Sequence, residues 1–207
     1  MKDFGFYLVV TNPVVGYERC CAAAVEAGVK MVQLRMKEAP REEILSVARA
    51  MRRITLGTET NFIVNDDPSI AAEAEADGVH VGQTDMSVAE VRSLYPSLRI
   101  VGLSTHNLDQ VAAAHAQKPD YIGVGPVYAT PTKKIPDPTL GPEMAGRMIA
   151  AAPCPAVAIG GINGDNLATV LAAGARNFAV VRAVCGSSDP FSAIRSLLAK
   201  GRIAEVK

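Results

Sequence analysis

The sequence predicts a single (β/α)8 TIM barrel over residues 1–207, and three observations support this fold class. Short apolar runs rich in Val and Ile recur along the whole chain, and segments with helical periodicity lie between them. The two patterns alternate about eight times without a linker or a shift in composition. A chain of 207 residues is also long enough to bury one sizeable core.

The runs expected to form strands mostly lack strict polar alternation, as strands buried on both faces do. In chain order they are Phe6–Val10, Val29–Leu34, Phe62–Val64, Gly78–Val81, Ile100–Leu103, Tyr121–Val124, Ala156–Ile159 and Phe178–Val181. A doubly wound open sheet is the alternative. It fits less well, because so many repeating units with so few extra residues leave little room for an irregular strand order.

Apolar stripes at helical spacing separate these runs. One stripe extends from Ile44 to Ile54 and ends near Gly57, a residue type that commonly caps a helix at its carboxyl end. Another begins at Asn163 and is closed by Gly174. We expect a helix at each stripe, with Asn163 at the start of the second.

Two helix starts carry capping signals. Ser87 with Glu90 has the spacing of a capping box, and Pro96 ends the helix that follows. Asn107 and Gln110 repeat the same spacing ahead of the next apolar stripe. These signals place helices directly after the fourth and fifth predicted strands.

Charge and composition exclude several function classes. The 21 basic residues balance the 21 acidic ones, so no overall field favours nucleic acid or a membrane surface. No apolar run is long enough to span a bilayer, and the amino-terminal segment lacks the features of a secretory signal. The four cysteines show no metal-ligand spacing. We expect a cytoplasmic protein that binds small molecules; its oligomeric state is not fixed by the sequence, and a homodimer stays open.

Two aspartates follow neighbouring predicted strands. Asp66 ends the run that begins at Phe62, and Asp85 lies just beyond the run that begins at Gly78. Taken separately, each has an ordinary interpretation as a turn residue or a residue near a helix start. Adjacent parallel strands lie about 4.8 Å apart, so two carboxylates at their ends can share Mg²⁺. This ion takes one or two carboxylates and completes its shell with water and phosphate.

Cationic and polar residues cluster at the same predicted rim. Arg35 and Lys37 are two apart and therefore point the same way in an extended segment, where both can bind phosphate oxygens. Gln33 lies on that face and can hydrogen-bond a neutral heterocycle. His80 and His106 lack zinc-site spacing, and each either lines the pocket or makes a structural hydrogen bond.

A second anion site is expected near the last three strands. The segment Thr130–Lys134 offers hydroxyls and two cations, although an exposed basic loop is its simpler interpretation. Gly160 and Gly161 follow the seventh strand and the Val181–Arg182 turn follows the eighth, where such barrels frequently hold a phosphate. Asn163 is expected to open a helix whose amino terminus favours an anion. Two phosphorylated substrates, or one bisphosphate, would fill both sites.

At these residues the sequence closely resembles the thiamine phosphate synthase family, in order and over nearly the whole chain. The segments that carry the resemblance are Gln33–Lys37, Asn65–Asp66, Gly78–Asp85, Ser104–Asn107, Tyr121–Tyr128, Thr130–Lys134 and Ala158–Ile162. The family is a (β/α)8 barrel that joins a hydroxymethylpyrimidine diphosphate to a hydroxyethylthiazole phosphate and releases pyrophosphate.

The resemblance implies a role for each site residue. The pyrimidine diphosphate would be held by Gln33, Leu34, Arg35, Met36, Lys37 and Asn65. Asp66 and Asp85 would bind Mg²⁺, and Ser104 would contact the leaving pyrophosphate. The thiazole substrate would meet Thr130, Pro131, Thr132 and Lys133, and its phosphate would meet Gly161, Val181 and Arg182. The catalytic set would be Arg35, Lys37, Ser104 and Lys133.

Three residues depart from the common family pattern. Met36 stands where Glu is usual, Asp67 often replaces a basic residue, and Arg182 occupies a place frequently held by Ser. A phosphate contact made through backbone N–H groups at the Val181–Arg182 turn would tolerate the last change.

The resemblance implies a dissociative substitution, because an electron-rich aminopyrimidine stabilises the cation left when pyrophosphate departs. Cations placed beforehand then favour the transition state. Two rivals remain. A related thiazole tautomerase would need a proton-transferring residue, commonly His, where this chain has Pro126. A barrel that binds phosphate ligands without catalysis would not need every charged group that is present.

Overall fold

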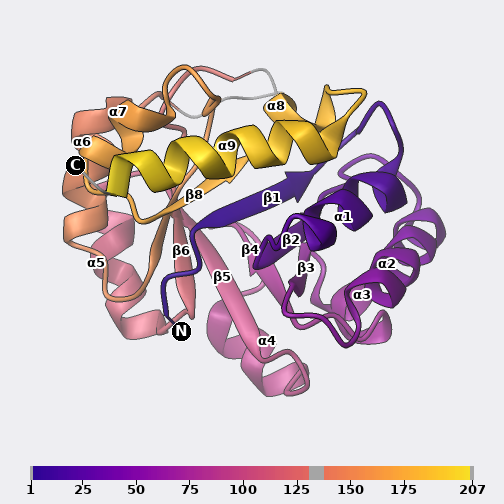
Figure 1. The fold of residues 1–207 in the computed structure, drawn as a ribbon. Helices are drawn as coiled ribbons and strands as arrows, with labels where there is room; N and C mark the ends of the chain where they lie inside the picture. Colours follow the sequence, from indigo (N-terminus) through magenta and orange to yellow (C-terminus); the bar gives the residue numbers. More distant parts are fainter. Residues whose placement is uncertain (1, 131–137, 206–207) are drawn as a thin grey trace.

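The computed structural model describes residues 2–130 and 138–205. Its parallel strands pair in chain order, and the last pairs with the first, which closes the sheet into a barrel (Figure 1). The strands are β1 (Phe6–Val10), β2 (Met31–Leu34), β3 (Asn61–Asn65), β4 (Gly78–Val81), β5 (Ile100–Thr105), β6 (Tyr121–Val124), β7 (Ala156–Ala158) and β8 (Asn177–Val180). The predicted (β/α)8 TIM barrel is confirmed.

Helices surround this barrel and connect successive strands (Figure 1). They are α1 (Tyr17–Glu26), α2 (Arg41–Thr55), α3 (Pro68–Glu73), α4 (Val88–Leu94), α5 (Leu108–Gln117), α6 (Gly141–Ala150), α7 (Leu167–Ala172), α8 (Arg182–Cys185) and α9 (Pro190–Glu205). The last helix packs against both α7 and α1, so it covers the seam where the sheet closes. Among the described residues, no helix is long and apolar enough to cross a membrane.

Side-chain alternation divides the core into two layers. In β1, Phe6, Leu8 and Val10 belong to the apolar layer beneath the helices. Tyr7 and Val9 point the other way and pack with interior residues of the other strands. Because each strand alternates in this way, its inward residues near the carboxyl end form the floor of the rim.

The predicted helix signals are mostly confirmed. Ser87 and Glu90 form the expected capping box at the start of α4. Asn107 caps α5 by accepting from the Gln110 N–H, but the Gln110 side chain accepts from the N–H of His106 and not from that of Asn107.

The predicted start of the helix after β7 is wrong. Asn166 occupies the N-cap position and α7 begins at Leu167, later than the expected start at Asn163. The Asn163 side chain instead accepts from the Asp165 N–H at 2.8 Å, and its own N–H donates to Asn166 Oδ1 at 2.9 Å. The Leu167 N–H also donates to the Asn163 carbonyl at 3.1 Å, so Asn163 caps a turn that leads directly into α7.

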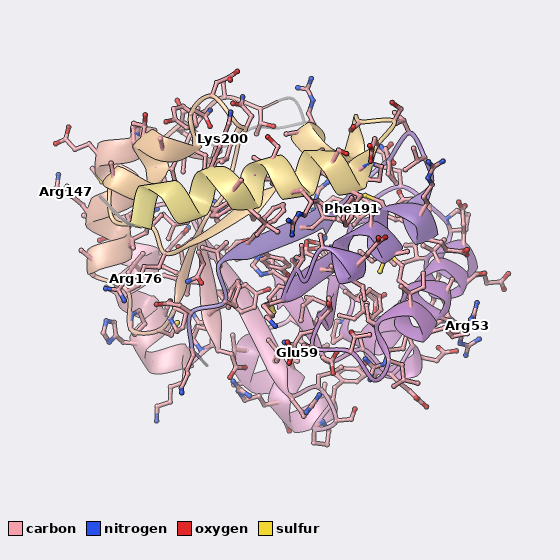
Figure 2. All side chains as sticks on the ribbon, viewed as in Figure 1. Arg53, Glu59, Arg147, Arg176, Phe191 and Lys200 are labelled. Carbon is pink, nitrogen blue, oxygen red and sulfur yellow. The ribbon has the colours of Figure 1, made fainter. Side chains whose placement is uncertain are left out.

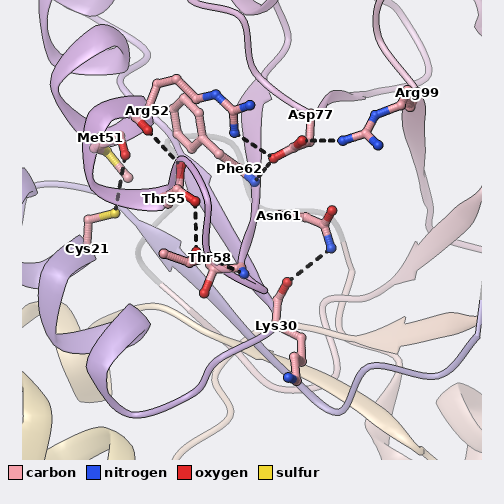
Figure 3. Close-up of polar contacts among 11 residues, drawn as sticks. Cys21, Lys30, Met51, Arg52, Thr55, Thr58, Asn61, Phe62, Asp77 and Arg99 are labelled. Carbon is pink, nitrogen blue, oxygen red and sulfur yellow. Dashed lines mark hydrogen bonds and ion pairs between the residues drawn. The ribbon is translucent and has the colours of Figure 1, made fainter.

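A buried carboxylate joins several elements at the amino-terminal end of the barrel (Figure 3). Asp77, just before β4, accepts from the Phe62 N–H at 2.9 Å and from the guanidinium groups of Arg52 and Arg99 at 3.0 Å and 2.6 Å. Its side chain is only 8% exposed. The carboxylate thus links α2, β3 and β4 at the end opposite the functional rim.

By contrast, the charged side chains labelled in Figure 2 extend from the outside of the molecule. Lys30 and Glu59 form an ion pair on that exterior. Such exposed pairs contribute little to stability, because water screens them and their side chains lose entropy on pairing.

We predict that Asp77→Ala lowers the free energy of unfolding by about 2–3 kcal/mol, because it strands the Phe62 N–H and the Arg52 guanidinium. Urea unfolding measures the change. Glu59→Ala, which removes the exposed ion pair, is the matched control and is expected to leave the midpoint unchanged. Equal midpoints for both variants would contradict the role assigned to Asp77.

Candidate functional site

Two cations follow β2 at the carboxyl-terminal rim. The Arg35 N–H donates to the Val10 carbonyl at 2.9 Å, so the chain continues alongside the end of β1. Arg35 is half-buried; burial lowers the pKa of its guanidinium, and the charge of Asp66 opposes that shift. The Lys37 ammonium lies 3.0 Å from Asp66 Oδ2. The predicted grouping of Arg35 and Lys37 with an acidic rim residue is therefore present.

Asp66 and Asp85 follow the carboxyl ends of the paired strands β3 and β4, and a backbone contact positions each of them. Asn65 pairs with His80, and the Asp66 N–H then donates to the His80 carbonyl at 2.8 Å. Asp66 has a φ of 64°, a left-handed conformation in which the chain leaves the strand direction. Asp85 folds back over the end of β4, because its Oδ2 accepts from the Gly82 N–H at 2.7 Å.

The Asp66 and Asp85 carboxylates are the type of donor that Mg²⁺ takes. Asp66 and Asp85 supply hard carboxylate oxygens at the ends of adjacent strands β3 and β4. Within residues 2–130 and 138–205, no group of three or more His, Cys, Asp or Glu residues converges. Two carboxylates suit an ion that completes its shell with water and substrate phosphate.

A chain of hydrogen bonds crosses the barrel interior below this rim. Gln33 Nε2 donates to the Tyr7 hydroxyl at 2.8 Å, and the hydroxyls of Tyr7 and Tyr121 are 2.9 Å apart. The Tyr121 hydroxyl lies 3.0 Å from His80 Nδ1, and His80 Nε2 lies 2.9 Å from Ser104 Oγ. Two predicted site residues, Gln33 and Ser104, are thereby connected through three others.

Sequence reasoning missed Tyr7 and Tyr121. Both occupy positions in apolar strand runs, where an aromatic residue is typical of a core. Their alternation in the strands could have placed both side chains on the interior face of β1 and β6. A tyrosine hydroxyl buried there requires a hydrogen-bond partner, which would have pointed to a polar contact inside the barrel. The pKa of both phenols is raised by burial, so both hydroxyls keep their protons.

The two histidines left open by the sequence take different positions. His80 is part of the interior chain of hydrogen bonds. His106 Nδ1 lies 2.6 Å from the Gly125 carbonyl, and the backbone N–H of His106 donates to Gln110 Oε1. His106 therefore ties the end of β5 to the segment after β6.

Other predicted substrate-binding residues separate into two groups. Asn65 is half-buried at the end of β3, directly beside Asp66. The Leu34 side chain is buried in the apolar layer beneath the helices, and Met36 packs against the same layer. Only backbone atoms of Leu34 are therefore available to a ligand at the rim, because the strand alternation that turns Gln33 inward turns Leu34 outward.

Gly160 and Gly161, after β7, pack against the segment that follows β6. The Tyr128 N–H donates to the Gly160 carbonyl at 3.0 Å. A Cβ on Gly161 would lie 2.7 Å from Tyr128 Cβ and 2.8 Å from the Ala129 carbonyl, and its φ is +65°. Gly161 thus lets the segment leading to half-buried Thr130 pack closely against the β7 loop.

Part of the predicted thiazole site lies outside the described residues, namely Pro131, Thr132 and Lys133. Val181 is half-buried at the start of α8, and Arg182 is exposed. Both lie at the end of β8, next to the β7 loop that carries Gly161. The α-helix after β7 begins at Leu167, and Asn163 caps the turn that precedes it.

A wide hollow lies at the opposite end of the barrel, where Lys2, Arg176 and Asn177 are among its lining residues. It contains none of the predicted site residues. Chemistry in parallel barrels is concentrated at the carboxyl-terminal ends of the strands, so the rim is the candidate functional site.

Comparison with known proteins identifies the family of the chain. A family model described as thiamine monophosphate synthase matches residues 6–184. The chain belongs to this family. Membership of the thiamine monophosphate synthase family supports the conclusion that the chain is an enzyme of thiamine biosynthesis.

Individual relatives cover the chain to different extents. A thiamine-phosphate synthase from Laribacter hongkongensis is 40% identical, with 99% of each chain covered. One from Synechocystis sp. is 41% identical over 96% of this chain, which spans only 57% of that relative. The solved thiamine phosphate pyrophosphorylase from Pyrococcus furiosus has a TM-score of 0.88 and 29% identity, covering 98% of this chain and 97% of the other.

We predict that Gly161→Ala displaces the Tyr128–Ala129 segment and destabilises the fold more than backbone strain alone does. Gly28→Ala is the control, because Gly28 has a φ of +77° and a Cβ added to it would meet nothing within 4 Å. Strain of this kind costs about 1 kcal/mol. Urea unfolding compares the two variants, and an equal loss of stability in both would contradict the packing role of Gly161.

Proposed function

We propose that this chain joins 4-amino-2-methyl-5-(diphosphooxymethyl)pyrimidine to hydroxyethylthiazole phosphate, giving thiamine phosphate and pyrophosphate. The observation that carries the proposal is the gathering of Arg35, Asp66, Asp85 and Ser104 at the carboxyl ends of four neighbouring strands, β2 to β5. Family membership supports the same reaction. The substrates, the mechanism and the metal are parts of the proposal.

The reaction begins with cleavage of the bond between the pyrimidine methylene carbon and the diphosphate oxygen. The electron pair leaves with pyrophosphate, and the aminopyrimidine ring delocalises the cation that remains. Arg35 and Lys37 lie at the rim where this negative charge develops, and their charges stabilise it. The thiazole nitrogen then supplies the electron pair of the new carbon–nitrogen bond.

Asp66 and Asp85 are proposed to hold Mg²⁺. When bound there, the ion would neutralise phosphate charge and would make pyrophosphate a better leaving group. Asp66 also keeps the Lys37 ammonium at the rim through their 3.0 Å ion pair. No side-chain nucleophile or general base is needed, so catalysis rests on charge placement and on holding both reactants together.

The second substrate is proposed to bind near β6 to β8. Thr130, Pro131, Thr132 and Lys133 would meet the thiazole ring and the departing phosphates. Gly161, Val181 and Arg182 would bind the thiazole phosphate. The adjacency of the β7 and β8 ends supports this arrangement, because both loops then face one bound phosphate.

The direct test mixes both substrates and Mg²⁺ with the purified chain and follows the products by chromatography. We expect thiamine phosphate and pyrophosphate in equal amounts. Omission of Mg²⁺ with a chelator present is expected to abolish turnover, since two carboxylates would then repel the diphosphate. Absence of both products under all conditions would overturn the proposed function.

We predict that Asp66→Ala and Asp85→Ala each lower Mg²⁺-dependent turnover by about 100-fold, because each removes a charged ligand at the leaving group. Steady-state rates at several Mg²⁺ concentrations measure the effect. Asp67→Ala is the matched control, since the Asp67 side chain caps α3 by accepting from the N–H groups of Ser69 and Ile70.

The control is expected to lose about 1 kcal/mol of stability and to keep its Mg²⁺ dependence. Wild-type rates in the Asp66 and Asp85 variants would remove the metal assignment. A loss in the Asp67 variant as large as in the others would show that the assay reports stability instead.

A further inference from the structure

The interior chain of hydrogen bonds has a direction, and Gln33 determines it. The amide nitrogen Nε2 can only donate, and it donates to the Tyr7 hydroxyl at 2.8 Å. Among the described residues, the partners of that hydroxyl are Gln33 and Tyr121. The Tyr7 proton is therefore donated to Tyr121, because the nitrogen of Gln33 cannot accept it.

The same assignment of donors and acceptors determines the direction of the next two hydrogen bonds. The Tyr121 hydroxyl accepts from Tyr7, and its own buried proton needs an acceptor; among its hydrogen-bond partners in the described residues, that acceptor is His80 Nδ1, 3.0 Å away. A neutral imidazole with an accepting Nδ1 carries its proton on Nε2. His80 Nε2–H then donates to Ser104 Oγ at 2.9 Å. The hydroxyl proton of Ser104 is left for an acceptor other than His80.

Burial of these residues means that each donor and acceptor must find its partner within the chain of hydrogen bonds. Gln33, Tyr7 and Tyr121 are 4%, 2% and 0% exposed, so water cannot readily replace a missing partner. The pKa of both phenols is raised by burial, which keeps one proton on each hydroxyl. A buried chain of this kind therefore runs in one direction or in the opposite one.

We propose that Gln33 sets the direction of this chain and so makes Ser104 a hydrogen-bond donor toward a phosphate group at the rim. Tyr7, Tyr121 and His80 are positioning residues that transmit the direction. The identity of the acceptor as the substrate diphosphate rests on the proposed function, whereas the direction of the chain in the free protein does not.

The orientation of the Gln33 amide links ring recognition to phosphate binding. With Nε2 on Tyr7, the oxygen Oε1 is the atom that can accept from a ring amino group. A flipped amide would accept from Tyr7, each later bond would reverse, and Ser104 would donate to His80 instead of phosphate. A heterocycle with an amino group facing Gln33 therefore favours the donor state of Ser104, and a ring that presents an acceptor there disfavours it.

The test measures the tautomer of His80 by ¹⁵N NMR of the full chain with labelled histidine at pH 8. In the free wild-type protein we expect the Nε2–H tautomer. Gln33→Met removes the donor that sets the direction, and we expect comparable populations of both tautomers. Gln110→Met is the matched control: Gln110 lies outside the chain of hydrogen bonds, on His106, and its loss is expected to leave His80 unchanged.

A second arm adds pyrophosphate with Mg²⁺. Phosphate oxygens only accept, so binding selects the arrangement in which Ser104 donates, and the Gln33→Met spectrum is expected to return to the Nε2–H tautomer. Adding Ser104→Ala to Gln33→Met is expected to abolish this return. If the chain of hydrogen bonds had a purely structural role, neither Gln33→Met nor pyrophosphate would change the His80 tautomer.

The outcomes separate the two proposals. An Nδ1–H tautomer in the free wild type, or an unchanged Nε2–H tautomer in Gln33→Met, overturns the direction assigned to Gln33. Binding of pyrophosphate without a return of the tautomer overturns the link through Ser104. Failure of pyrophosphate to bind the wild type counts against the proposed function, while the spectra of the free protein still decide the direction of the chain.

Discussion

Closure of the parallel sheet is the constraint on which the rest of the structure depends. Because β8 pairs with β1, each strand delivers its carboxyl end to the same rim. Residues from β2 to β5 that are far apart in sequence therefore become neighbours around one position. The amino-terminal end is held separately by contacts such as those of Asp77, so stability and function lie at opposite ends of the barrel.

The same closure encloses polar groups that must be satisfied inside. Tyr7 and Tyr121 are separated by 114 positions in the chain, yet their hydroxyls meet within the barrel. Each polar residue of the interior chain finds its partner on another strand, and the series ends at the rim at Ser104. An interior of this kind ties the geometry of Gln33 to the geometry of Ser104.

Much of the fold was predictable because it depends on local patterns. Buried strands appear in the sequence as apolar runs, and the cap at Ser87 was visible as a short motif. The start of α7 differs from the prediction because a turn capped by Asn163 precedes the helix, and the sequence pattern does not separate that turn from the helix itself. The carboxyl end of β5 extends beyond the predicted Leu103 to Thr105 because Ser104 and Thr105 pair with β6, which the sequence does not display.

The site was predictable in outline and not in its connections. Asp66, Asp85 and Arg35 were found because strand ends of a parallel barrel share one rim. The role of Tyr7 and Tyr121 depends on which face of a strand points inward and on contacts across the barrel. Leu34 shows the converse, since its place in a matching motif does not turn its side chain toward the rim.

In the proposed reaction, one rim position holds the leaving group between the carboxylates, the cations and Ser104. A crystal structure of the chain with Mg²⁺, pyrophosphate and thiamine phosphate tests it most directly. The account predicts Mg²⁺ at about 2.1 Å from oxygens of Asp66 and Asp85, with pyrophosphate in contact with Arg35 and Ser104. Pyrophosphate bound elsewhere, or Mg²⁺ held without these carboxylates, would contradict it.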